Sequence, residues 1–235
     1  MRDDGKLNYV VNRDRDDPIV ARQGSRIEMT GPKRGIYVAH AVLIEYDVRI
    51  KSGEREEDDL QLIDGAFPCK YQRPWKPITN RITGECGAVD VSLAFVQDAV
   101  EATVEVEISK VQRGFDTAVS LSSFVYIWED YEEIPLFHGA VDPSRGLRRR
   151  FVVAVTLGTK MLLKLKVGDS VERCCSFKAA PHGCAGEKMK LELASVSVKS
   201  TTAQRMSLHM PSATFIRVTA ITTIPLLRPR AMSSG

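Results

Sequence analysis

The sequence predicts an all-β protein, a single domain built as an antiparallel β-sandwich or a partly open barrel. Apolar and polar side chains alternate over several runs, glycine-containing turns separate some of them, and no long segment repeats with the period of a helix. Because successive side chains of a strand point to opposite faces, each alternating run offers one face to a core and one to water.

The alternating runs identify the side chains that we expect in the core. In chain order they cover residues 42–51, 89–95, 100–108 and 161–167. Residues 151–157 are apolar almost without interruption, which suits a strand covered on both faces. The apolar positions that share a face are Val42, Ile44, Tyr46, Val48 and Ile50; Val89, Val91, Leu93 and Phe95; Val100, Ala102, Val104, Val106 and Ile108; and Met161, Leu163, Leu165 and Val167.

Turn residues set the expected ends of the strands. Gly158-Thr159 and Gly168-Asp169 each suit a two-residue hairpin turn with glycine first. Prolines 68, 74 and 77 predict an irregular stretch over residues 67–87. After Lys199 the chain is rich in Ser and Thr and loses the alternation. We therefore expect a disordered start at residues 1–6, the β-sandwich domain at 7–198, and a disordered or loosely attached tail at 199–235.

The small net charge of +3 conceals an uneven distribution. From Arg145 onward the chain carries 16 lysines and arginines against 4 acidic residues, a balance of +12, and the preceding part has a balance of −9. Such asymmetry indicates a surface for nucleic acid or anionic lipid, unless the two halves interleave in the fold and neutralise each other. Both interpretations remain open at this point.

The densest basic cluster is Arg145, Arg148, Arg149 and Arg150, which is the candidate site for an anion or RNA. Arginine suits phosphate through its planar set of donors. No aromatic residue interleaves with the cluster, so the stacking platform expected for single-stranded RNA is missing. The alternative is a solvated strand entry or an ion pair with the acidic residues of 129–133.

No catalytic, metal or cofactor site is predicted. Phosphate-binding loops, zinc-protease motifs and nucleophile elbows do not occur in the sequence. Glu101, Glu105 and Glu107 fall on the solvent face of their run. Four soft ligands (Cys174, Cys175, His182 and Cys184) lack the paired spacing of zinc sites. We therefore expect no enzyme, no metal and no cofactor.

The sequence also predicts a compartment. No apolar stretch reaches the roughly 20 residues of a membrane-spanning helix, and the first residues are charged where a secretory signal is apolar. Five cysteines without framework spacing suit free thiols in a reducing environment. The expected location is the cytoplasm or the nucleus.

Several segments, in order, resemble a plant family found largely in grasses, the domain of unknown function 6598. The resemblance covers about residues 7–198, and whether the first strand of the family fold is missing stays open. The segments that carry it are Leu-Asn-Tyr-Val-Val-Asn-Arg at 7–13, Met-Thr-Gly-Pro-Lys-Arg-Gly-Ile at 29–36, residues 42–51, Val-Gln-Asp-Ala-Val-Glu-Ala-Thr-Val-Glu-Val at 96–106, Ile-Pro-Leu-Phe at 134–137 and Arg-Arg-Arg-Phe-Val-Val-Ala-Val at 148–155.

The resemblance implies a biological context, and it does not imply a biochemical activity. Some members of the family are joined to a ribosome-inactivating glycosidase, which implies stress or defence. The Glu-x-x-Arg pair of that toxin occurs nowhere in this chain. We expect a non-enzymatic domain that binds an unknown protein partner. The second hypothesis is an RNA- or ribosome-associated domain that uses the basic half.

Overall fold

The computed structural model describes residues 7–27, 29–36, 38, 41–70, 77–127, 129–169, 171–203 and 215–223, the last range by its backbone alone. This part of the chain holds fourteen strands and one short 3-10 helix, η1 (Glu56–Asp58). The strands are β1 (Arg26–Ile27), β2 (Val42–Ile50), β3 (Leu60–Cys69), β4 (Ile78–Gly84), β5 (Gly87–Val96), β6 (Ala99–Ser109), β7 (Ala118–Ile127), β8 (Asp130–Ala140), β9 (Leu147–Thr156), β10 (Lys160–Val167), β11 (Val171–Lys178), β12 (His182–Lys190), β13 (Ser195–Ala203) and β14 (Phe215–Thr223).

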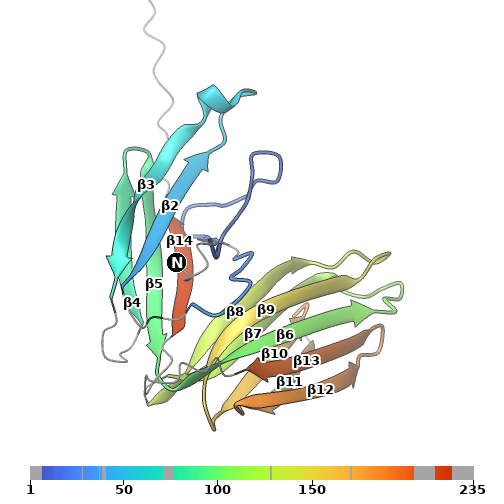
Figure 1. Ribbon diagram of the computed structural model, residues 1–235. Coiled ribbons are helices and arrows are strands. Elements are labelled where there is room, and N and C mark those ends of the chain that lie inside the picture. The colour runs from blue at the N-terminus through green and yellow to red at the C-terminus, as the bar shows by residue number, and fades with distance from the viewer. Residues whose placement is uncertain are drawn as a thin grey trace, which may run out of the picture.

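The strands form two lobes, each made of two facing sheets (Figure 1). The first lobe has a four-stranded sheet in the order β1-β14-β5-β4 and the two-stranded sheet β2-β3. The second lobe has two four-stranded sheets, β12-β13-β6-β9 and β11-β10-β7-β8. All of these strand pairs are antiparallel.

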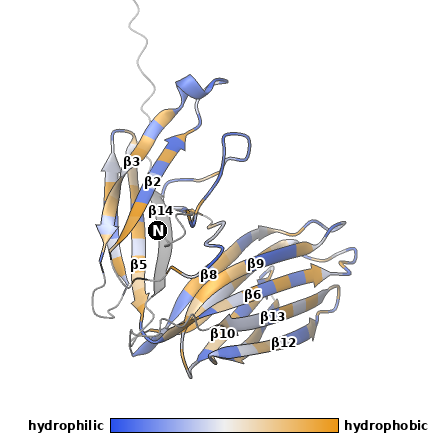
Figure 2. Cartoon of the chain, viewed as in Figure 1, coloured by the Kyte–Doolittle hydropathy of each residue, from blue (hydrophilic) through white to orange (hydrophobic). Residues whose placement is uncertain are grey.

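Each lobe buries its own cluster of apolar side chains. In the first lobe, β2, β3 and β5 supply the cluster around Val42, Leu62 and Leu93. In the second lobe, the larger cluster lies between the two four-stranded sheets and includes Val104 and Leu163. Figure 2 shows the alternation of apolar and polar residues along these strands. The single domain expected from the sequence therefore has two cores.

The all-β, antiparallel prediction is confirmed, and the sheets are open. All of the apolar positions predicted for 89–95, 100–108 and 161–167 are buried in one of the two clusters. From the run at 42–51, Val42 is buried and the other four side chains pack against the first cluster. These runs were predictable because one face of each strand meets a core.

Two expectations about segment ends differ from the structure. Residues 78–84 form β4 instead of an irregular stretch; its side chains are mostly exposed, so no alternation marks it. Gly158 does not close a hairpin, because β9 and β10 belong to different sheets, whereas Gly168-Asp169 does join the paired strands β10 and β11.

The chain after Lys199 also differs from the predicted tail. β13 continues to Ala203, since its backbone stays paired with β6 although its side chains become polar. Residues 215–223 form β14 between β1 and β5. The rest of the predicted tail, and the predicted disordered start at 1–6, lie outside the described residues.

Two glycines with a positive φ provide a test of the fold. Gly146 (φ 71°) closes the turn before β9, and a Cβ added there would clash with the Ile108 carbonyl oxygen. Gly158 (φ 80°) has open space where a Cβ would lie, with no heavy atom within 4 Å. Gly158→Ala should therefore lower the free energy of unfolding by only about 1–2 kcal/mol, because the alanine has to adopt a left-handed backbone conformation. Gly146→Ala should lower the free energy of unfolding by about 1–3 kcal/mol more, because the added Cβ overpacks the site. Urea unfolding measures both losses. Equal losses would contradict the close approach at Gly146.

Candidate interaction groove

The arginine cluster lies beside the acidic row of β6. In the antiparallel register of β6 and β9, Arg148 is opposite Glu107 and Arg150 is opposite Glu105. Directly opposed side chains share a face and come within reach of each other. These glutamates, and not the acidic residues of 129–133, are the cross-strand neighbours of the two arginines.

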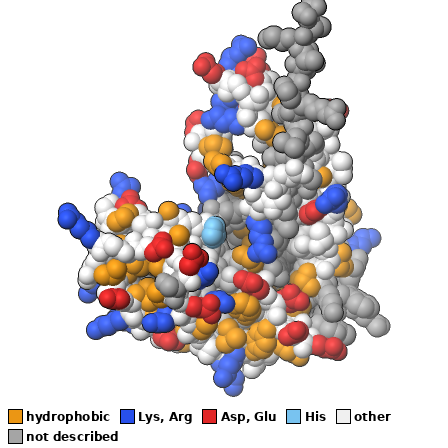
Figure 3. Space-filling view, turned by 180° about the vertical axis from the view of Figure 1, so that it is seen from behind, with side chains coloured by type: hydrophobic (Ala, Val, Ile, Leu, Met, Phe, Trp, Pro, Cys, Tyr) orange, Lys and Arg blue, Asp and Glu red, His pale blue; other side chains and the backbone are white. Residues whose placement is uncertain are grey.

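A lysine flanks the same acidic row on its other side. On the other side of β6, Lys199 of β13 is opposite Glu105. The exposed face of this sheet therefore places acidic side chains between basic ones. On the other side of the molecule, which Figure 3 shows, Lys and Arg are also interspersed with Asp and Glu. The basic and acidic parts of the sequence interleave here, which favours mutual neutralisation over a continuous basic surface.

The other two arginines of the cluster do not take part in this pairing. Arg149 lies on the opposite side of β9, and its guanidinium carbon is 6.0 Å from the centroid of the Phe137 ring. Arg145 belongs to the turn before β9, where its backbone N–H donates to the Asp142 carboxylate. Hydrogen bonds from the side chain and backbone of Ser144 hold the pKa of Asp142 below its usual value. The four arginines thus do not form one binding face.

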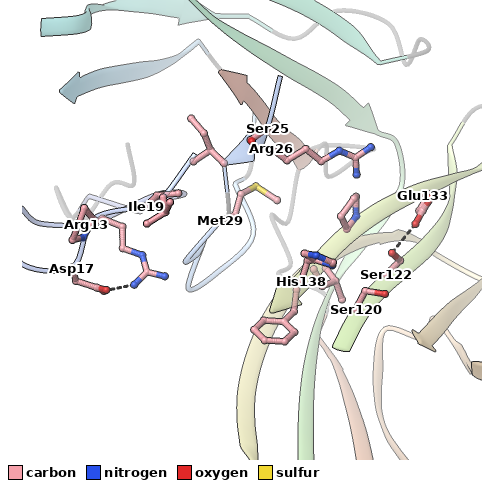
Figure 4. Close-up of a pocket in the computed structure, with 16 residues that line it drawn as sticks. Arg13, Asp17, Ile19, Ser25, Arg26, Met29, Ser120, Ser122, Glu133 and His138 are labelled. Carbon is pink, nitrogen blue, oxygen red and sulfur yellow. Dashed lines mark hydrogen bonds and ion pairs between the residues drawn. The ribbon is translucent and has the colours of Figure 1, made fainter. Parts of the chain in front are cut away.

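The described residues do enclose a groove between the two lobes. One wall is the N-terminal segment of residues 13–29, and the other is the outer surface of β7 and β8 (Figure 4). Its volume is about 700 Å³. Its lining consists of Arg13, Asp17, Pro18, Ile19, Val20, Ser25, Arg26, Ile27, Met29, Ser120, Ser122, Glu133, Pro135, Leu136, Phe137 and His138.

Charged groups of both signs border an apolar floor in this groove. Ser122 donates to Glu133 across the β7–β8 pair at 2.7 Å, and Arg13 forms an ion pair with Asp17 on the other wall. Arg26 extends from the N-terminal wall toward β8, where His138 lies (Figure 4). The floor is made by buried Leu136 and Phe137 together with half-buried Pro135.

The N-terminal wall is held in place by its own hydrogen bonds. The backbone N–H groups of Thr30 and Gly31 donate to the Val10 carbonyl at 3.0 and 2.9 Å, and the Asn12 N–H donates to the Thr30 hydroxyl at 2.9 Å. The Gly35 N–H donates to the Glu101 carboxylate of β6 at 2.8 Å. The segments at 7–13 and 29–36 are therefore tied to each other and, through Glu101, to the second lobe.

Arg15 fastens this wall to the first lobe. Its guanidinium donates to the Asp59 carboxylate at 3.0 Å and to the Arg55 carbonyl at 3.0 Å. The Ser52 N–H donates to the Asp59 carboxylate at 2.9 Å, and this hydrogen bond is the main cause of the lowered pKa of Asp59. The Arg15 guanidinium lowers this pKa further. The wall is thus stabilised by a charge network at one end and backbone hydrogen bonds at the other.

Sequence reasoning missed the groove because its two walls are about a hundred positions apart in the chain. Ser120 and His138 are register partners on neighbouring strands, but each is an ordinary polar residue on the solvent face of its run. No motif marks them. The only local signal was the pair of segments at 7–13 and 29–36, which carried the family resemblance.

The cysteine and histidine residues near the C-terminal part do not come together as a site. Cys174 and Cys184 are exposed, whereas burial raises the pKa of the neighbouring Cys175 thiol to about 12. In the described part of the chain, no three His, Cys, Asp or Glu side chains are grouped to hold a metal.

None of the helices within the described residues is long and apolar enough to cross a membrane.

Charge reversal tests the pairing of β9 with β6. Arg148→Glu together with Arg150→Glu would set like charges against Glu107 and Glu105, so we expect a loss of about 0.5–1 kcal/mol per pair in urea unfolding at low salt. The loss should shrink in high salt. Adding Glu107→Arg to the single variant Arg148→Glu should restore stability, because the uncharged Ser197 faces Glu107 on its other side, and Arg145→Glu should cost less. Failure of the charge swap to restore stability would refute the cross-strand pairing.

The comparisons with known proteins identify the chain by its sequence. The family model described as "Domain of unknown function (DUF6598)" matches residues 1–201. Neither a curated protein nor a solved structure matches the chain significantly. Because the matched region includes both walls of the groove and most of both cores, the chain belongs to the DUF6598 family.

Proposed function

We propose that this protein is a non-enzymatic interaction module, acting in a plant stress or defence setting, whose groove holds an extended segment of a protein partner. The observation that carries the proposal is the groove between residues 13–29 and the β7–β8 surface. The plant setting rests on the family resemblance, and the groove supports binding of a ligand without assigning any chemistry to it.

The lining suits a polypeptide better than a nucleic acid. A nucleic-acid surface neutralises phosphates with an excess of lysine and arginine. This groove instead has acidic Asp17 and Glu133 as well as basic Arg13 and Arg26 around apolar side chains. Mixed charges around an apolar floor are typical of sites that fix a peptide by a few polar contacts.

Arg26 and His138 are the residues that we expect to select the partner. Arginine binds a carboxylate through two parallel donors, and a histidine N–H supplies a further hydrogen bond. Asp17 and Glu133 already have donors within the protein, namely Arg13 and Ser122. An acidic side chain of the partner would therefore lie between Arg26 and His138.

The second candidate, an RNA- or ribosome-associated domain, rests on the +12 balance from Arg145 onward. The register that places Glu105 and Glu107 opposite Arg150 and Arg148 weakens it, since it gives that surface mixed charge. A separate titration with RNA decides between the two: RNA binding that falls with salt and is lost on reversal of these arginines would replace the peptide proposal.

Selection from a library of random 12-residue peptides tests the groove. We expect enriched peptides to contain Asp or Glu between apolar residues, and Arg26→Ala with His138→Ala to weaken their binding at least tenfold in fluorescence anisotropy. The matched control is Lys70→Ala with Arg113→Ala, two exposed cations outside the groove. Peptides that bind both double variants equally, or no enrichment at all, would contradict the proposal.

A further inference from the structure

A second surface of the protein is the open edge of β12. Among the described strands, β12 ends its sheet and is paired on one side only, where nine register pairs join it to β13 from His182↔Ala203 to Lys190↔Ser195. The register has no shift along this length. An edge strand presents unpaired N–H and C=O groups along its other side, which is a template for another strand.

Two of the other three described edges of the second lobe carry features that oppose the addition of a strand, whereas the third, β11, has neither a proline nor a register shift. The register of β8 with β7 shifts at Leu121/Ser122, and β8 contains Pro135. The edge strand β9 carries three consecutive arginines and contacts β5 and β14 of the first lobe. β12 has neither a proline nor a register shift. Bulges and prolines block strand addition, so β12 is a more open edge than β8 or β9. The exposure of its side chains distinguishes it from β11, where Cys175 and Phe177 are buried.

Both faces of β12 are accessible. Eight of its nine residues are exposed, and Met189 alone is half-buried. Its first half contains Gly183, Cys184, Ala185 and Gly186, whose small side chains leave the backbone uncovered. Figure 1 shows the strand at the rim of the second lobe, away from the first lobe. A further strand could therefore approach without displacing any described element.

The charge on one face of β12 indicates what such a strand would carry. Lys188 and Lys190 lie on the face that also holds Lys199 of β13, which is opposite Gly186. Glu187 lies on the other face, because it alternates with the lysines. Opposite charges directly across a strand pair are stabilising and like charges are not. Acidic side chains at alternate positions of an added strand would fit this face.

A second copy of this chain does not fit the same edge. When a strand pairs with its own copy about a two-fold axis, each side of the strand stays on the same side of the joint sheet. Odd-numbered residues are then opposite odd-numbered residues of the copy, and even-numbered residues are opposite even-numbered ones. Glu187 can then never face Lys188 or Lys190 of the copy. The lysines instead face one another or small residues, so self-pairing gains no ion pair.

We propose that the free edge of β12 binds an extended segment of a protein partner by antiparallel strand addition, and that acidic residues alternating along this segment face Lys188 and Lys190. Main-chain hydrogen bonds supply affinity in this mode and alternate side chains supply specificity. The surface is separate from the groove, so it does not depend on the function proposed above.

The probe is a nine-residue peptide alternating Val and Asp, with a Val-Lys peptide as its counterpart. Amide hydrogen exchange should show at least tenfold slower exchange within residues 182–190 when the Val-Asp peptide is added, and no change with Val-Lys. Lys188→Glu with Lys190→Glu should weaken the Val-Asp peptide at least tenfold and should admit the Val-Lys peptide. The control is Lys33→Glu with Lys70→Glu, which makes the same charge change at exposed lysines of the first lobe and should alter nothing.

Each contrary result is distinct. Protection at residues 120–138 without protection at 182–190 would place the peptide in the groove and overturn the edge proposal. Equal binding of both peptides would remove the role of the lysines. Dimerisation of the peptide-free protein in sedimentation, with slower exchange within residues 182–190 at higher protein concentration, would show that the edge pairs with its own copy. Unchanged melting temperatures establish that the variants are folded.

Discussion

The two lobes depend on β5, which takes part in both hydrophobic cores. Val89, Val91, Leu93 and Phe95 belong to the cluster of the first lobe. Ala94 and Val96 belong to the cluster of the second. Only Gln97 and Asp98 separate β5 from β6, the central strand of the second lobe. Asp98 adopts the left-handed conformation that this tight turn needs, with φ 47°, and its carbonyl accepts from the Leu157 N–H at 2.8 Å.

This continuity positions the functional surfaces. Because β5 enters the second core directly, the first lobe is held at one end of the second sandwich, and the Gly35–Glu101 hydrogen bond adds another connection. The N-terminal segment is thereby placed opposite the outer surface of β7 and β8, and the groove is the space between them. β12 lies on the opposite edge of its sheet from β9, which contacts the first lobe, and so remains open.

The side-chain pattern predicted the faces of the strands but not their neighbours. Met161, Leu163, Leu165 and Val167 are buried because a period of two follows from strand geometry alone. Whether Gly158 closes a hairpin or passes from one sheet to the other depends on long-range pairing, which local turn residues do not encode. β4 was missed since neither of its faces is fully buried.

The same limit applies to the sites. The arginine cluster was visible in the sequence, but the glutamates opposite Arg148 and Arg150 are about forty positions earlier and become neighbours only through the β6–β9 register. Arg26 and His138 line the same groove only through the packing of the two lobes. The openness of β12 follows from the order of strands in its sheet. Each of these properties belongs to the tertiary structure.

The most direct test of the shared role of β5 is native-state hydrogen exchange at increasing urea, comparing Val91 of β5 with Leu163 of β10, which lie in different cores. If β5 couples the lobes, both amides should exchange through the same global unfolding, and Leu93→Ala should lower the free energy of unfolding at both sites by the same 2–5 kcal/mol or so. Two separate transitions, with Leu163 unaffected by Leu93→Ala, would contradict the coupling.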